Sequence, residues 1–331
     1  MINSYIKGIA HYVPDEVLTN TDLSKMMDTS DEWITTRTGI QKRHTVGTTN
    51  MGPADLAVRA SELLFKKYSI DKGEIDFVVF ATSTPDYFVP GSGSIFQDKL
   101  GLSNIGVLDI RQGCSGFTYA ITVADQFIKS GSYKNVLVIG AEVQTTQLDF
   151  DDEGRGTAVL FGDGAAACLI SGTKKDKGIL SSHLHSDGKY IEELGTEYPS
   201  SRYKDIITPE KVKERKHHIH MNGREVFKHA VRRFPEVILE GLEYNNLTVD
   251  DVNLVVPHQA NYRITQAVQK QLKVPDNKIF SNIHKYGNTT AASIGIALSE
   301  ALEQNLIKDN DIIVLASFGA GWYWGSVIIK W

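Results

Sequence analysis

Residues 110–142, IRQGCSGFTYAITVADQFIKSGSYKNVLVIGAE, decide the fold because they recur in altered form at residues 283–317, IHKYGNTTAASIGIALSEALEQNLIKDNDIIVLAS. Each copy has a polar turn, a helical pattern of apolar residues and a short β-branched run typical of a buried strand. Aligning the two copies places Gly113-Cys114 on Gly287-Asn288. A cysteine and an asparagine therefore stand at equivalent helix starts.

The repeat extends on both sides of these segments. Upstream, FVVFATSTPDYFVPGSGSIFQDKLGL (77–102) parallels LVVPHQANYRITQAVQKQLKV (254–274), and downstream FGDGAAACLI (161–170) parallels FGAGWYWGSVII (318–329). Three matches in the same order predict a duplicated α/β unit whose copies pack about a pseudo-two-fold axis. Such packing brings equivalent loops of the two copies to one central site.

We place the boundary between the copies at residue 173. Residues 1–173 form the first half, which carries Cys114, and residues 174–331 form the second half, which carries the candidate histidine and asparagine. Segments 143–157 and 174–222 do not repeat, and we expect both to be surface loops that shape access to the site, the second as a loop-rich connector.

Composition limits the class of protein. The chain has 331 residues, of which 41% are hydrophobic and 23% charged, and its formal net charge is −5. These values are typical of a globular enzyme and argue against a disordered chain or a binder of nucleic acid. Two cysteines far apart favour a reducing compartment, and no apolar run reaches the ~20 residues that span a bilayer. We therefore expect a cytoplasmic protein that binds neither membrane nor nucleic acid.

Three side chains on strand–helix turns are candidates for chemistry. A cysteine at a helix start, such as Cys114, is either a small buried hydrophobe or a nucleophile that the helix end helps to ionise. His258 follows an apolar strand at its C-terminal end, and Asn288 either caps a helix or offers its amide. Together they supply a nucleophile, an imidazole and an amide donor, which suits a reaction that develops negative charge on a carbonyl oxygen. Cys168, inside an apolar strand, is expected in the core.

Two polar segments carry weaker signals. KHHIH (216–220) lacks the ligand spacing of known metal sites, so we expect no metal. Residues 211–233 hold eight Lys and Arg against two Glu, which indicates either a solvated helix face or a docking surface for an anionic partner.

Eight motifs in order resemble one family, the β-ketoacyl-acyl-carrier-protein synthases III of the thiolase superfamily. The resemblance covers nearly the whole chain. The motifs are TSDEWITTRTGI (29–40), GCSGFTYAITVADQFIKSG (113–131), GRGTAVLFGDGAAA (154–167), SSHLHSDG (181–188), MNGREVFKHAV (221–231), VPHQANYRI (256–264), GNTTAASIGIAL (287–298) and SFGAGWYWGS (317–326).

The resemblance implies a homodimer with a five-layered αβαβα fold of duplicated halves, and a decarboxylating Claisen condensation. Cys114 would take an acyl group from acyl-CoA, and malonyl-acyl carrier protein would extend it to a β-ketoacyl product that initiates fatty-acid synthesis. His258 and Asn288 would stabilise the enolate, and the backbone N–H groups of Cys114 and Ala320 would form the oxyanion hole. Acyl-CoA is a substrate in this scheme, and no cofactor is implied.

Further positions are implied by their match to family motifs. Phe318 would shield the site, and Lys228 with Arg263 would meet the acidic carrier protein. Trp33 and an arginine would sandwich the adenine of the nucleotide. The matching substrate-binding positions are Trp33, Arg37, Val89, Arg155, Gly223, Phe227, Ala260, Asn261, Arg263 and Phe318.

The chain departs from the family pattern in three places. Gln112-Gly113 replaces two small apolar residues, and Val89 replaces a large aromatic residue that closes the acyl pocket across the dimer. The loop 189–217 is longer and more charged. The smaller gate predicts primers longer than acetyl, or branched ones.

Two alternatives to fatty-acid initiation stay open, and a third is disfavoured. The departures suit a ketosynthase of specialised metabolism that uses unusual acyl donors or a β-ketoacyl acceptor. A Cys–His pair also permits a thioesterase. An inactive partner subunit is disfavoured because the chain keeps all three candidate side chains.

Overall fold

The computed structural model describes residues 2–331 and contains two mixed β-sheets. The first sheet has the strand order β1-β7-β6-β4-β5 and the second β11-β12-β13-β8. The strands of the first sheet are β1 (Asn3–Tyr12), β4 (Phe77–Ala81), β5 (Gly106–Ile110), β6 (Asn135–Glu142) and β7 (Gly164–Thr173). Those of the second are β8 (Gly178–Ser186), β11 (Leu254–Pro257), β12 (Ile312–Gly319) and β13 (Tyr323–Lys330).

Both sheets follow one topology. In the first sheet β4 and β6 pair in parallel, and β7 and β1 continue the sheet as antiparallel neighbours. In the second sheet β11 and β12 pair in parallel, followed by antiparallel β13 and β8. Even β5, which pairs in parallel with β4, has a counterpart in the isolated parallel bridge between Val255 and Ile279. The duplication predicted from the sequence is therefore confirmed in the strand order.

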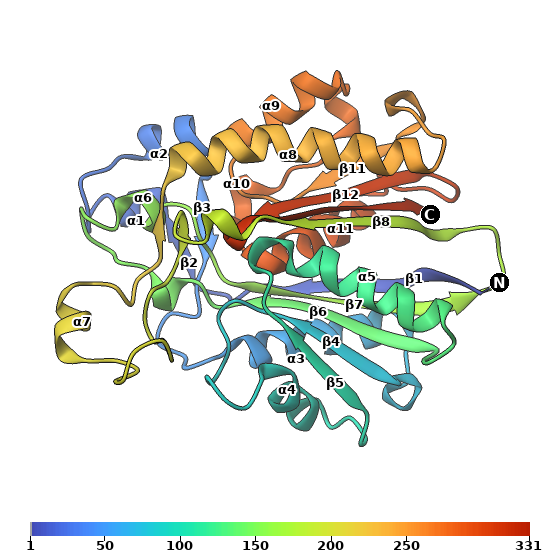
Figure 1. Cartoon of the computed structure of the whole chain (residues 1–331), viewed down its shortest axis with the longest axis horizontal. Coiled ribbons are helices and arrows are strands. Elements are labelled where there is room, and N and C mark those ends of the chain that lie inside the picture. Colours follow the sequence, from blue (N-terminus) through green and yellow to red (C-terminus); the bar gives the residue numbers. More distant parts are fainter. Residues whose placement is uncertain (1) are drawn as a thin grey trace.

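Helices separate and cover the two sheets, which gives five layers (Figure 1). Helices α5 (Gly116–Lys129) and α11 (Ser293–Glu303) lie between the sheets. On the outer faces, α3 (Pro53–Tyr68) and α4 (Ser92–Leu100) pack on the first sheet. On the other side of the molecule α8 (Gly223–Tyr244) packs on the second sheet, and α9 (Tyr262–Leu272) packs against α8.

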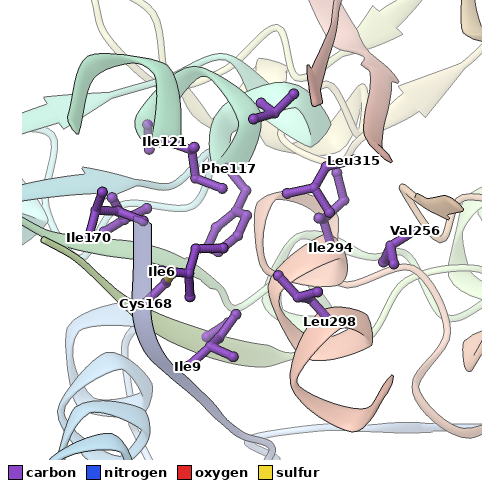
Figure 2. Close-up of a cluster of buried hydrophobic side chains, with 14 of the residues drawn as sticks. Ile6, Ile9, Phe117, Ile121, Cys168, Ile170, Val256, Ile294, Leu298 and Leu315 are labelled. Atoms are coloured by element: carbon purple, nitrogen blue, oxygen red, sulfur yellow. The ribbon is translucent and has the colours of Figure 1, made fainter. Parts of the chain in front are cut away.

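The two central helices hold the core together. A helix buried between two sheets must be apolar on most of its surface, and all residues of α11 from Ser293 to Ala301 are buried. Figure 2 shows Phe117 and Ile121 of α5 and Ile294 and Leu298 of α11 in one cluster with strand residues of both sheets. Cys168 is fully buried in this cluster, as expected.

The two halves touch closely at the N-terminal ends of the central helices. A Cβ added at Gly116, the first residue of α5, would lie 3.0 Å from Ala81 Cβ and 3.1 Å from Ala291 Cβ. Only a residue without a side chain allows this approach without a shift of its neighbours. The equivalent turns that precede α5 and α11 are thereby brought side by side.

The two segments expected to be surface loops are more structured than predicted. The connector 174–222 begins with strand β8, which forms an edge of the second sheet, so this part is not a loop. In segment 143–157, Val143, Gln144, Thr145 and Leu148 are buried. The comparison of the two sequence repeats missed β8 because the strand at the equivalent position of the first sheet, β1, lies at the start of the chain and not after the repeated segments.

Short elements complete the chain around these layers. No helix within residues 2–331 combines the length and the apolar character that a membrane span requires. The short strands are β2 (Val17–Thr19), β3 (Lys42–His44), β9 (Leu194–Gly195) and β10 (His220–Met221). The short helices are α1 (Asn20–Leu23), α2 (Asp31–Thr38), α6 (Arg155–Ala158), α7 (Pro209–Lys213) and α10 (Ile283–Tyr286).

Candidate active site

Cys114 lies in a short 3-10 turn, Gly113–Ser115, that leads directly into α5. Gly113 adopts φ +49°, a left-handed conformation that favours glycine. Opposite the thiol, the end of β12 passes so closely that a Cβ on Gly319 would lie 2.5 Å from Cys114 Cβ. The side chain of Cys114 is consequently only 5% exposed.

Burial controls the ionisation of the Cys114 thiol. Burial, and next the nearby Glu142 carboxyl, raise the pKa of Cys114 to about 12, although hydrogen bonding from the backbone N–H groups of Ala320 and Cys114 opposes the shift. In the resting protein Cys114 is therefore held as a thiol rather than a thiolate. The helix start offers N–H groups to the sulfur, but the loss of water outweighs them.

His258 follows β11 and is held as a neutral ring. Its Nδ1 lies 2.6 Å from Ser293 Oγ, at the first residue of α11, and Ser293 Oγ also accepts the backbone N–H of Gln259 at 3.4 Å. Ser293 Oγ can donate its O–H to Nδ1, and a ring that is held in this way carries its proton on Nε2. Burial lowers the pKa of His258 to about 3, so the ring stays neutral near pH 7.

The amide of Asn288 is oriented by the turn that precedes α11. Asn288 Oδ1 accepts the backbone N–H of Thr290 at 2.9 Å, so the oxygen end serves as a cap. The backbone of Asn288 pairs with Leu160 and Gly162 of the first half. Asn288 Nδ2 donates to no residue in the range 2–331, which leaves an N–H donor for a ligand.

Two cavities meet at Cys114. The smaller cavity, of about 120 Å³, is lined by Cys114, His258 and Asn288 together. The larger cavity, of about 440 Å³, is also lined by Cys114 and includes Ala320, Gln144 and Thr290. The thiol, the imidazole and the amide are far apart in sequence, but all three line the smaller cavity. The thiol also lines the larger cavity.

The other residues implied by the family motifs fall into three groups, and the first lines the smaller cavity. Phe318, Gly223, Phe227, Ala260 and Asn261 line the smaller cavity. Phe318 is 3% exposed, and Asn261 caps α9 by accepting the Arg263 N–H at 2.9 Å.

Two arginines lie over the indole of Trp33, outside both cavities. The guanidinium carbon of Arg37 is 4.8 Å from the ring centroid of Trp33, and that of Arg155 is 5.3 Å from it. Such cation–π contacts orient flat groups and are a suitable platform for an adenine.

The remaining positions lie on the surface. Lys228 pairs with Glu225 at 3.1 Å, and Arg263 is exposed at the start of α9. Val89 is 79% exposed, and it lines neither of the two cavities of its own chain.

Three residues that line the site or support it from behind were missed by the sequence analysis. Ser293 orients His258, while Glu142 is a buried carboxyl whose pKa burial raises to about 7. Gln144 lines the larger cavity beside Glu142. For Glu142 the sequence offers one signal, because a charged residue ends the apolar strand NVLVIGAE. No comparable signal marks Ser293 or Gln144.

Comparison with known proteins agrees with the family resemblance of the sequence motifs. The family model described as 3-Oxoacyl-[acyl-carrier-protein (ACP)] synthase III matches residues 108–188. A second family model, described as 3-Oxoacyl-[acyl-carrier-protein (ACP)] synthase III C terminal, matches residues 242–331. The chain is 44% identical to a beta-ketoacyl-[acyl-carrier-protein] synthase III of Caldanaerobacter subterraneus, over 98% of this chain and 97% of that protein.

Solved structures agree along the whole chain. The 3-oxoacyl-[acyl-carrier-protein] synthase III of Aquifex aeolicus has a TM-score of 0.90 at 40% identity, with 99% of this chain and 100% of that chain covered. The beta-ketoacyl-[acyl-carrier-protein] synthase III of Thermus thermophilus has a TM-score of 0.91 at 38% identity, with 99% of both chains covered. The thiolase-like fold and the enzyme class expected from the motifs are confirmed, and the chain belongs to the β-ketoacyl-[acyl-carrier-protein] synthase III family.

Proposed function

We propose that Cys114 carries the acyl group in a two-stage condensation that initiates a fatty acid. In the first stage the thiol attacks the acyl-CoA carbonyl, so a Cys114 thioester forms and the CoA thiol leaves. In the second stage malonyl-acyl carrier protein loses CO₂, its enolate carbon attacks the acyl carbonyl, and the Cys114 sulfur leaves and takes up a proton. The position of Cys114 between two cavities, one of them shared with His258 and Asn288, carries the proposal.

The first stage needs no net change of charge at the thiol. Because the pKa of Cys114 is raised by burial, its proton leaves only as the bond to the acyl carbon forms, and the departing CoA sulfur gains one in exchange. The tetrahedral oxygen would be stabilised by the N–H groups of Cys114 and Ala320, which already donate toward the sulfur.

The second stage uses two neutral donors. His258 Nε2 is buried without a hydrogen-bond partner in residues 2–331, and the Asn288 amide is turned so that its oxygen accepts the Thr290 N–H and its nitrogen is left for a ligand. Both would donate to the malonyl thioester oxygen as it becomes an enolate. A neutral ring is suited to this role because it keeps its proton throughout. Phe318 would place an apolar ring beside the malonyl carboxylate, which favours its departure as CO₂.

The residues between Cys114 and the surface would bind the pantetheine arm, the nucleotide of CoA and the carrier protein. Gly223 and Phe227 at the start of α8 and Ala260 and Asn261 before α9 line the smaller cavity and would hold the pantetheine arm. Outside this passage, Trp33 with Arg37 and Arg155 would take the nucleotide of CoA. Lys228 and Arg263 would contact the acidic carrier protein.

The first sheet offers an edge for a second copy of the chain. Strand β5 ends the sheet and has no neighbour on its outer side. Nearby, Tyr87, Phe88 and Val89 are 62%, 55% and 79% exposed, which is unusual for adjacent apolar residues. We propose a homodimer in which β5 strands pair and Val89 reaches toward the partner's acyl site. The two cysteines are unpaired, in keeping with a cytoplasmic protein.

The experiment is acyl loading followed by product analysis. The protein is incubated with a panel of acyl-CoAs from acetyl to C10, straight and branched, and adducts are located by intact mass and peptide mapping. We expect adducts on Cys114 with primers longer than acetyl or branched, and none in Cys114→Ala. Addition of malonyl-acyl carrier protein should then give the β-ketoacyl product.

Two results would contradict the proposal. Release of free acid from acyl-CoA at an unchanged rate without malonyl-acyl carrier protein would identify a thioesterase. Much faster turnover of acetyl-CoA than of C6–C10 primers would overturn the primer assignment and leave the condensation standing.

A further inference from the structure

The larger cavity, which Cys114 also lines, would hold the acyl group of the Cys114 thioester, and it combines apolar walls with polar groups that lack partners. Phe88, Phe161 and Leu194 contribute apolar surface, whereas Gln144 and Thr290 contribute polar side chains. Gln144 is 2% exposed and Thr290 is 5% exposed. A purely aliphatic acyl group would leave their buried polar atoms without hydrogen bonds, which is costly.

The orientation of the Gln144 amide is fixed from behind. Its Nε2 donates to Ser83 Oγ at 2.9 Å and to Glu142 Oε2 at 3.3 Å. Glu142 also accepts the backbone N–H groups of Ser83 and Ala291, so its oxygens act as acceptors. The NH₂ end of the Gln144 amide, which donates, is therefore the end that fits beside Glu142. The opposite end of the amide, Gln144 Oε1, is buried and has no hydrogen-bond partner in residues 2–331.

Thr290 presents a second unpartnered oxygen. Its Oγ1 is buried and makes no hydrogen bond within the described chain. The next residue, Ala291, donates its N–H to Glu142 Oε1 at 3.3 Å, so one carboxyl group anchors both Gln144 and the turn that holds Thr290. The two residues that carry the free oxygens therefore line one cavity and are held by the same carboxyl group.

This polar part lies near the thioester end of the acyl site. The turn Thr290–Ala292 packs against the start of α5, since a Cβ on Gly116 would be 3.1 Å from Ala291 Cβ. Gly116 is two residues after Cys114. A substituent that meets Thr290 and Gln144 would thus stand near the start of the acyl chain that Cys114 carries.

We propose that the acyl group carried by Cys114 bears a hydroxyl near its thioester end, bound between Gln144 Oε1 and Thr290 Oγ1. A hydroxyl is both donor and acceptor, so it can donate to the Gln144 carbonyl and accept from the Thr290 hydroxyl. A ketone offers only an acceptor, and a methyl group offers neither. The proposal rests on the proposed function, because it requires an acyl-Cys114 intermediate.

The test compares primers of equal length. Butyryl-CoA competes with each enantiomer of 2-hydroxybutyryl-CoA and 3-hydroxybutyryl-CoA for loading onto Cys114, and adducts are counted by intact mass. We expect at least one hydroxyacyl primer to load with a kcat/KM about tenfold or more above that of butyryl-CoA. Gln144→Leu and Thr290→Val should each abolish this preference.

Controls separate recognition from damage. Gln304→Leu makes the same chemical change at an exposed position after α11 and should keep the wild-type preference. Circular dichroism and thermal unfolding check that each variant folds, and Gln144→Met replaces Gln144→Leu if the latter does not.

Each remaining outcome has a defined meaning. Equal loading of butyryl and every hydroxybutyryl primer by the wild-type protein overturns the hydroxyl assignment but leaves the acyl-Cys114 scheme intact. A hydroxyl preference that survives both Gln144→Leu and Thr290→Val also overturns it, because the hydroxyl is then bound elsewhere. Absence of every adduct from Cys114 instead contradicts the proposed function.

Discussion

At the scale of single residues, ionisation is set by burial rather than by the helix end. The sequence identified Cys114, His258 and Asn288, because each stands on a strand–helix turn that the repeat predicts to converge. It could not identify the protonation states, which depend on water exclusion by Gly319 and its neighbours. Ser293 was missed for a similar reason, since its contact with His258 joins segments 35 residues apart.

Ser293 is a positioning residue for the His258 ring. In Ser293→Ala the ring proton is no longer held on Nε2. A fraction of the protein then carries the proton on Nδ1 and lacks the Nε2–H donor toward the enolate. We expect condensation to fall about tenfold or more while acyl loading of Cys114 stays near the wild-type rate. Ser293→Thr, which keeps the hydroxyl, should recover much of the condensation rate. A matching fall in loading would contradict this role.

The protonation state of His258 can be observed directly. Its folded pKa of about 3 lies below the ordinary value of 6.5, so the ring should remain neutral, with the proton on Nε2, from pH 8 to pH 5. Nitrogen NMR of histidine-labelled protein would show this. The linked contribution to the free energy of unfolding is complete above pH 6.5 and is lost as the pH falls toward 3. Titration of His258 near pH 6.5 would contradict the assignment.

At the scale of elements, the site is made where the ends of β12, α5 and α11 meet. The strands and helices of the repeated units were predictable from apolar periodicity, and the β-branched run at the end of segment 110–142 forms strand β6. Segment 143–157 was predicted to be a surface loop because it is polar and does not repeat. Its first residues are buried because Glu142 and Gln144 bond to Ser83 of the neighbouring strand end, a contact that no local pattern reveals.

The close passage of β12 against Cys114 predicts the effect of one methyl group. Gly319 has φ −171°, which any residue can adopt, so Gly319→Ala adds a clash with Cys114 Cβ at 2.5 Å rather than backbone strain. We expect acyl loading to fall about 100-fold, because the thiol and the Ala320 N–H are displaced from each other. Gly188→Ala, where a Cβ would meet nothing within 4 Å, is the matched control. Equal loading in both variants would contradict the proposed geometry.

At the scale of the whole molecule, duplication explains why one site forms between two halves. Each copy supplies a turn before a central helix, and the first copy brings the nucleophile while the second brings the amide. This arrangement was predictable from three ordered sequence matches. The edge strand β5 has no partner within the chain, so its role depends on assembly rather than on folding of one copy.

The exposed edge predicts a stable dimer in solution. Sedimentation should show twice the mass of the chain at micromolar concentration. Leu108→Lys, on the exposed β5, should weaken the dimer through like-charge repulsion across a symmetric contact. A wild-type protein that sediments as a monomer and still condenses at full rate would contradict pairing through β5.

The most direct test of the central claim is a single-turnover chase of the Cys114 thioester. Wild-type, His258→Ala and Asn288→Ala proteins are loaded with one acyl group, mixed with malonyl-acyl carrier protein, and followed by intact mass. We predict that all three load, that the wild-type adduct is consumed as β-ketoacyl-carrier protein appears, and that both variants retain the adduct. Consumption of the adduct by His258→Ala at the wild-type rate, or an acyl group found on a residue other than Cys114, would contradict the account.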